Sequence, residues 1–224
     1  EAQYIAMFKR LRQYLRDGVA DGSLRALEPT ATTRALLGSI DWAFSWLHKI
    51  PPAQLGSTAL QAVDILTRGL YGGNGEYAPS ALDMAGLGTR PPQGFDREQQ
   101  NRLKQYAFYK TGTWLFNRKG FDGTSLDEIA EQLHVSKGAF YYHIRNKEDL
   151  LYNCYGRSID LVENIHMQVA QSQGSGLEKV EQTCRRIFYC QNTDEGPLIR
   201  YNSITALPTA RRREILKRTD AANE

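Results

Sequence analysis

The chain has 224 residues, of which 41% are apolar and 24% charged, a composition typical of a globular protein with one or two domains. A net charge of +3 is too small for a histone-like or membrane-surface protein, so nucleic-acid binding would be confined to a local patch. The chain has no apolar run of about eighteen residues and no signal-peptide pattern, which predicts a cytoplasmic protein without membrane contact. Cys154, Cys184 and Cys190 lack metal or redox spacing and are expected to be free thiols, mostly buried.

Residues 1–75 are predicted to form three helices. Residues 1–22 carry an apolar stripe at helical spacing, made of Tyr4, Phe8, Leu11, Leu15 and Val19, with Met7 and Tyr14 widening it. Glu28 and Pro29 favour the start of a helix over 30–49, which carries Trp42 and Trp46 and ends before two prolines. A third helix is expected over 55–71, with Ala59, Val63, Leu66 and Leu70 in register and glycines at its end.

Residues 76–96 are predicted to be a linker, because they are rich in proline and glycine and poor in large apolar side chains. A helix is expected over 97–119, capped by Asp96 and ended by Gly120, with Phe121 packing under the segment that follows. Its expected contribution to a core consists of Leu103, Tyr106, Ala107, Tyr109, Trp114 and Leu115.

Residues 123–150 carry the pattern of a helix-turn-helix. A first helix is predicted from Leu126 to Leu133, capped by Thr124 or Ser125, with Glu128 reaching back to the cap. Its inward stripe is expected to be Leu126, Ile129, Ala130 and Leu133. After a turn at 134–136, Ser136 is expected to cap a second helix from Lys137 to about Ile144.

The second helix of this motif is predicted to have one buried and one exposed face. Phe140 and Ile144, four residues apart, are expected to face the core. The other side chains would point outward: Lys137, Ala139, Tyr141, Tyr142 and His143. Residues 136–147 hold three basic residues and no acid, so this face is locally positive. A lysine can bond guanine, an alanine can touch a thymine methyl and a phenol can bond phosphate. The alternative is that these are half-buried aromatics and a solvated charge.

Gly138 is an unusual choice inside a helix, since glycine there costs roughly 1 kcal/mol relative to alanine. A close approach of the helix backbone to DNA would explain it.

The run IAEQLHVSKGAFYYHIRNKEDLL resembles the DNA-binding domain of the TetR (tetracycline repressor) family of bacterial transcriptional regulators. The resemblance implies that Lys137, Gly138 and Ala139 begin the recognition helix, where the family reads base edges. It implies phosphate contacts for Tyr141 and Lys147 and groove-facing roles for Tyr142 and His143. Ala139 departs from the threonine often found there, which removes one hydrogen bond. The expected DNA-binding set is Thr124, Ser125, Ser136, Lys137, Gly138, Ala139, Tyr141, Tyr142, His143 and Lys147.

A long helix is predicted over 147–171, with Leu150, Leu151, Cys154, Ile159, Leu161, Val162, Ile165 and Val169 available for burial. A further helix is expected to follow, and residues 197–207 lead to a basic helix after Pro208. This basic helix is interpreted as a solvated surface helix, with a second DNA contact as the alternative.

The sequence therefore predicts an all-α protein with a three-helix helix-turn-helix domain and helical-bundle regulatory segments. Residues 1–75, with RDGVADGSLR and DILTRGLYGG, resemble the C-terminal regulatory and dimerisation segment of a first TetR-like unit. After the linker at 76–96, residues 97–147 would form the DNA-binding domain, and 148–224 the first part of a second regulatory domain. We expect a fragment of a longer tandem regulator. Alternatively, residues 1–75 supply the packing surface that this shortened second domain lacks.

The resemblance implies a ligand-responsive repressor that binds a palindromic operator in double-stranded DNA through residues 137–143. It would act as a homodimer, or as a pseudo-dimer of the tandem units, and respond to an unidentified small-molecule effector. No enzyme activity, cofactor or metal is expected, because His48, His134, His143 and His166 lack metal spacing and there is no nucleophile motif. The alternative function is a protein-interaction scaffold that has lost DNA binding.

Overall fold

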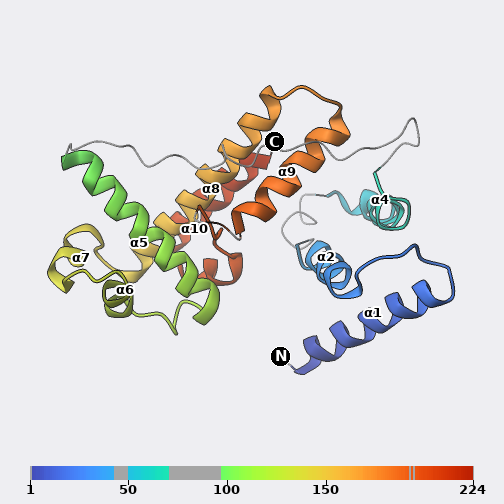
Figure 1. Cartoon of the computed structure of the whole chain (residues 1–224), viewed down its shortest axis with the longest axis horizontal. Helices are drawn as coiled ribbons and strands as arrows, with labels where there is room; N and C mark the ends of the chain where they lie inside the picture. The colour runs from blue at the N-terminus through green and yellow to red at the C-terminus, as the bar shows by residue number, and fades with distance from the viewer. Residues whose placement is uncertain (1, 43–49, 71–96, 192, 194, 224) are drawn as a thin grey trace. The chain divides into compact units, whose positions relative to one another are not determined.

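The computed structural model describes residues 2–42, 50–70, 97–191, 193 and 195–223, and every regular element within these ranges is a helix (Figure 1). The predicted all-α fold is confirmed. The chain divides into two compact units, Glu1–Glu76 and Tyr77–Glu224. The predicted linker at 76–96, Trp46 and the side chain of Trp42 lie outside the described residues.

In the first unit, α1 (Ala2–Ala20) packs against α2 (Pro29–Trp42), and the short helix η1 (Pro52–Gln54) leads into α4 (Leu55–Arg68). The start of α2 is as predicted: Pro29 is its first residue, and the Glu28 carboxylate accepts hydrogen bonds from the next two backbone N–H groups. Leu15 of α1 and Leu37 of α2 are buried, so the two helices share a small core.

Two predictions for the first unit are wrong. Met7 and Tyr14 do not widen the buried stripe of α1, since their side chains are 47% and 61% exposed. Helix α4 ends at Arg68 rather than at residue 71, because Gly69 takes a φ of +77° that favours glycine and stops the helix. The four residues expected in register on this third helix, Ala59, Val63, Leu66 and Leu70, are all exposed.

In the second unit, α5 (Arg97–Lys119), α6 (Leu126–Gln132) and α7 (Lys137–His143) form what we term the head. Helix α8 (Lys147–Gln171) extends from the head and packs against α9 (Gly176–Gln191) and α10 (Thr209–Asn223), with η2 (Tyr201–Ala206) between these two in sequence (Figure 1). The predicted bounds of α5 and α8 are confirmed, and the helix-turn-helix lies where the pattern placed it.

One core joins the head to α8. Phe108, Leu115 and Phe116 of α5 are buried together with Ile129, Phe140 and Ile144 of the motif and Leu150, Leu151, Cys154 and Tyr155 of α8. The two long helices approach closely at Gly112, where a Cβ atom would lie 3.1 Å from Leu150 Cδ2. The prediction that Trp114 belongs to this core is wrong. Its side chain is 42% exposed, with the Arg118 guanidinium 5.1 Å from its ring centroid. Val162 is only half-buried.

The segment 197–200 connects the head to the rest of the unit through side-chain hydrogen bonds. The Asn117 amide of α5 donates to the Leu198 carbonyl and accepts from the Arg200 N–H, both at 2.8 Å. From α8, the Ser158 hydroxyl accepts from the Ile199 N–H at 2.9 Å, and the Tyr155 hydroxyl donates to the Arg200 carbonyl at 3.0 Å. Side chains of α5 and α8 thus replace the backbone partners that an irregular segment lacks.

Candidate nucleic-acid interface

Helix α6 is fixed by hydrogen bonds at both ends. At its start the Ser125 hydroxyl accepts from the Glu128 N–H at 3.1 Å, so Ser125 is the cap. At its end the Val135 N–H donates to the Ala130 carbonyl at 3.0 Å, and His134 takes a φ of 54°, the pattern of a Schellman motif. The predicted return contact of Glu128 is wrong, because its carboxylate bonds the Lys119 ammonium instead.

Helix α7 has the two faces that the sequence predicts. The Ser136 hydroxyl caps it by accepting from the Ala139 N–H at 3.2 Å. Phe140 and Ile144 are fully buried, and the Phe140 ring meets Phe108 of α5 edge-on with centroids 4.9 Å apart. A helix of seven residues has little stability alone, so this packing is what fixes its direction.

The opposite face of α7 is open. Tyr142 is 83% exposed and Tyr141 47% exposed, and Lys137 and Ala139 are exposed beside them. Apart from its chain neighbours and its own helix backbone, no atom of the described residues lies within 4 Å of where a Cβ atom on Gly138 would be, so packing among them does not require glycine there. The His143 side chain is less exposed than expected. It is half-buried, with its ring centroid 5.7 Å from that of Phe108.

Asp127 of α6 joins two of the predicted site residues. Its carboxylate accepts from the Lys137 ammonium at 2.5 Å and from the Tyr141 hydroxyl at 3.3 Å. The hydrogen bond from Lys137 lowers the pKa of Asp127, and the same bond raises the pKa of Lys137. The sequence places Asp127 on the polar face of α6 but does not show that it faces α7. The one sign of this contact in the sequence is that an acid lies ten residues before a lysine, with a short turn between them.

Thr124 and Lys147 form contacts at the turn that precedes α6. Thr124 is buried, and its hydroxyl donates to the Gly120 carbonyl at 2.8 Å. Thr124 is therefore not one of the exposed residues of the motif. The Lys147 ammonium donates to the Thr124 carbonyl at 3.1 Å and lies 4.3 Å from the centroid of the Phe121 ring. Lys147 therefore ties the first turn of α8 to the turn before α6.

A cavity of about 440 Å³ lies between α5, α8 and α10, away from the exposed face of α7. Its polar lining includes Arg102, Tyr106, Arg157, Asp160 and Arg218. Arg157 is buried and donates to the Tyr106 hydroxyl and the Pro197 carbonyl, both at 3.1 Å, so it also links α5 to the segment before η2. No local sequence pattern indicates this cavity, because its residues come from three separated helices.

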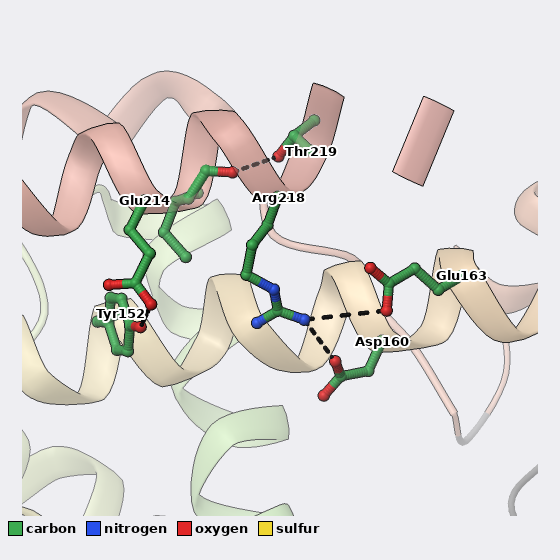
Figure 2. Close-up of polar contacts among 7 residues, drawn as sticks. Tyr152, Asp160, Glu163, Glu214, Arg218 and Thr219 are labelled. Carbon is green, nitrogen blue, oxygen red and sulfur yellow. Dashed lines mark hydrogen bonds and ion pairs between the residues drawn. The ribbon is translucent and has the colours of Figure 1, made fainter. Parts of the chain in front are cut away.

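The basic helix α10 directs two of its arginines to α8. Arg218 bonds Asp160 at 2.8 Å and lies 3.9 Å from the Glu163 carboxylate, and the Tyr152 hydroxyl donates to Glu214 at 2.7 Å (Figure 2). Arg211 pairs with Asp149 at 3.0 Å, at the first turn of α8. These contacts assign Arg211 and Arg218 to packing between the two helices.

The described ranges hold neither of two other kinds of site. No helix in them combines the length and apolar character needed to cross a bilayer. Nor do they bring together three or more His, Cys, Asp or Glu side chains that would suit a metal ion.

Two family models match the chain. Residues 109–153 match the model described as bacterial regulatory proteins, tetR family, which covers most of the head and the start of α8. Residues 4–70 match the model described as tetracyclin repressor-like, C-terminal domain, which spans the first unit.

The relatives cover only part of the chain. The transposon Tn10 TetC protein of Escherichia coli is 35% identical over 69 residues, which are 30% of this chain and 35% of that protein. The uncharacterized HTH-type transcriptional regulator YerO of Bacillus subtilis is 39% identical over 71 residues, 30% of this chain and 25% of YerO. The biofilm operon icaADBC HTH-type negative transcriptional regulator IcaR of Staphylococcus epidermidis is 39% identical over 56 residues, 23% of this chain and 30% of IcaR.

The chain thus spans about a third or less of the length of these relatives. No solved structure matches.

Proposed function

Because the chain belongs to the TetR family of bacterial regulatory proteins, we propose that it is a transcriptional regulator that binds a specific DNA sequence through α7. The observation that carries the proposal is the division of α7 into a buried and an open face. Phe140 and Ile144 hold the helix to the head, while Lys137, Tyr141 and Tyr142 stand on its exposed side. A short helix held rigidly with one polar face free suits insertion into the major groove.

Each exposed residue has a role that follows from its chemistry. The Lys137 ammonium can bond O6 or N7 of guanine, and the Ala139 methyl can touch the methyl of thymine. The Tyr141 hydroxyl can bond a phosphate oxygen, and Tyr142 and His143 complete the groove-facing set. Gly138 allows the helix backbone to approach DNA, since it has no side chain and no other described part of the chain fills that space.

The remaining predicted site residues support this face. Ser125 and Ser136 cap α6 and α7, and their exposed positions at helix starts suit phosphate contacts. Lys147 donates one N–H to the Thr124 carbonyl, and a lysine ammonium has two more donors that could bond a phosphate. A two-fold dimer would place two copies of α7 in successive major grooves about 34 Å apart, on a palindromic operator.

The regulatory part of the proposal is a ligand-responsive repressor in the cytoplasm. IcaR is named as a negative transcriptional regulator, which favours repression for this chain as well. The cavity between α5, α8 and α10 is the candidate site for a small-molecule effector, because a ligand there would contact both the head and the regulatory helices. A ligand that favours one spacing of the two heads would shift the population between DNA-binding and non-binding states.

The first unit is proposed to be a C-terminal-type regulatory or dimerisation segment that precedes the head in a tandem arrangement. The match of residues 4–70 to a C-terminal domain model, ahead of the head in sequence, supports this order. The exposed apolar side chains of α4 suit a partner helix, either in a homodimer or in a pseudo-dimer of tandem units.

Selection of binding sites from a random duplex pool with the whole chain tests the proposal. We expect a palindromic site with half-sites about one helical turn apart. The salt dependence of binding to that site is then measured for wild type and Tyr141→Phe. Loss of this phosphate contact should weaken binding to all sequences alike and leave the salt slope unchanged, because the tyrosine hydroxyl is uncharged. Tyr189→Phe is the matched control, since Tyr189 is an exposed tyrosine on α9, outside the head.

Absence of any selected site would contradict the proposal and favour the protein-interaction scaffold. In that case the face of α7 would be expected to become protected from solvent by a protein partner and not by a duplex.

A further inference from the structure

Asp127 is an acid within the surface proposed to bind DNA, where a negative charge opposes binding to phosphate. Its carboxylate accepts from Lys137 at 2.5 Å and from Tyr141 at 3.3 Å, two residues one turn apart on α7. The neighbouring acid Glu128 is directed elsewhere, to Lys119. A single carboxylate of α6 therefore controls the direction of two polar side chains on the exposed face of α7.

Stability of the head does not account for this arrangement. Asp127 and Lys137 have side chains 49% and 69% exposed, and exposed ion pairs contribute little to folding. Helices α6 and α7 are already joined by the buried side chains of Ile129 and Phe140. A favourable acid at the start of α6 is also supplied by Glu128. What the Asp127 contacts do change is where Lys137 and Tyr141 point.

Building on the proposed function, we propose that Asp127 is a specificity-determining residue that keeps Lys137 from binding phosphates indiscriminately. A lysine ammonium has three donors, so Lys137 can bond guanine while it stays bonded to Asp127. On a sequence without the correct base, Lys137 would have to leave Asp127 to reach a phosphate. The lost bond offsets the phosphate contact, and binding to random DNA is weakened more than binding to the operator.

The test compares wild type with Asp127→Asn on the selected operator and on a random duplex, each over a range of salt concentrations. The whole chain is used, and thermal melting checks that the variant is folded. One additional phosphate contact steepens the plot of log affinity against log salt by about 0.9, which is about a threefold larger change in affinity between 50 and 200 mM salt. We expect this change on the random duplex, with a matching loss of discrimination between the two duplexes.

Two further variants separate the proposed role from a general charge effect. Glu131→Gln removes the same charge from the same helix, and Glu131 acts on Lys137 only through its charge, not through a hydrogen bond. In a Lys137→Met background, Asp127→Asn should no longer change the salt slope, because the side chain it releases is gone.

An unchanged random-duplex affinity in Asp127→Asn, an equal effect of Glu131→Gln, or an effect that persists in Lys137→Met would each overturn the inference. These outcomes leave the proposed function standing as long as the wild type prefers its operator. A wild type that binds both duplexes equally would instead refute the proposed function, and the inference with it.

Discussion

Phe140 and Tyr142 are aromatic residues two positions apart on α7. Replacement of each by alanine should have very different effects on the stability of the protein. The Phe140 side chain is fully buried, with its ring 4.9 Å from that of Phe108, whereas Tyr142 is 83% exposed. Replacement of a buried phenylalanine by alanine removes its apolar contacts and leaves a cavity, at a cost of about 3–5 kcal/mol. A domain has about 5–15 kcal/mol of stability in total, so Phe140→Ala removes a large fraction of it.

Urea unfolding monitored by circular dichroism measures this loss. With a slope of about 2 kcal/mol per M, the midpoint for the second unit should fall by roughly 2 M in Phe140→Ala. Tyr142→Ala should shift it by less than about 0.3 M, because exposed substitutions change stability by about 0.5 kcal/mol or less. Both variants should lose operator affinity, Phe140→Ala because α7 loses its anchor and Tyr142→Ala because a contact is lost. Equal midpoints for the two variants would refute the assignment of the two faces of α7.

Three other substitutions and one reagent probe separate features. Gly138→Ala should raise stability by up to about 1 kcal/mol in urea unfolding, yet weaken operator binding, because its Cβ has open space in the protein but would meet DNA. Asn117→Ala should lower stability by about 1–2 kcal/mol, because two backbone groups at 2.8 Å lose their partner.

Burial raises the pKa of Cys154 to about 12, so iodoacetamide at pH 8 should label the exposed Cys184 and spare Cys154 until urea unfolds the chain. Because the unfolded thiol ionises at its ordinary pKa of 9.0, stability should fall as the pH rises from about 9 to 12, and Cys154→Ala should reduce that fall.

Patterns local to one helix could be predicted from the sequence. The capping serines Ser125 and Ser136 and the pair Phe140 and Ile144 lie where their spacing indicates, because each requires only neighbours within one or two turns. Helix α8 has its predicted bounds, and the apolar residues expected to be buried on it are buried apart from Val162.

Features that depend on a second helix could not be predicted in the same way. Helix α5 carries aromatic residues on all sides, so its periodicity does not distinguish Phe108 and Phe116, which are buried, from Trp114, which is exposed. The contact of Asp127 with α7 depends on the turn at His134, whose positive φ sets the angle between the two helices of the motif. The side chains that hold segment 197–200 are about 40 and 80 residues away in sequence, beyond any local pattern.

Base recognition by Lys137 is the central claim, and a scan of the operator tests it most directly. The affinity of wild type and Lys137→Ala is measured for the selected operator and for duplexes with each base pair replaced in turn. Loss of a base contact should weaken binding to the intact operator by about five- to 150-fold and abolish discrimination at one position in each half-site, while the other positions keep theirs. A uniform loss across all duplexes, with discrimination intact at every position, would show that Lys137 binds only phosphate and would contradict the account.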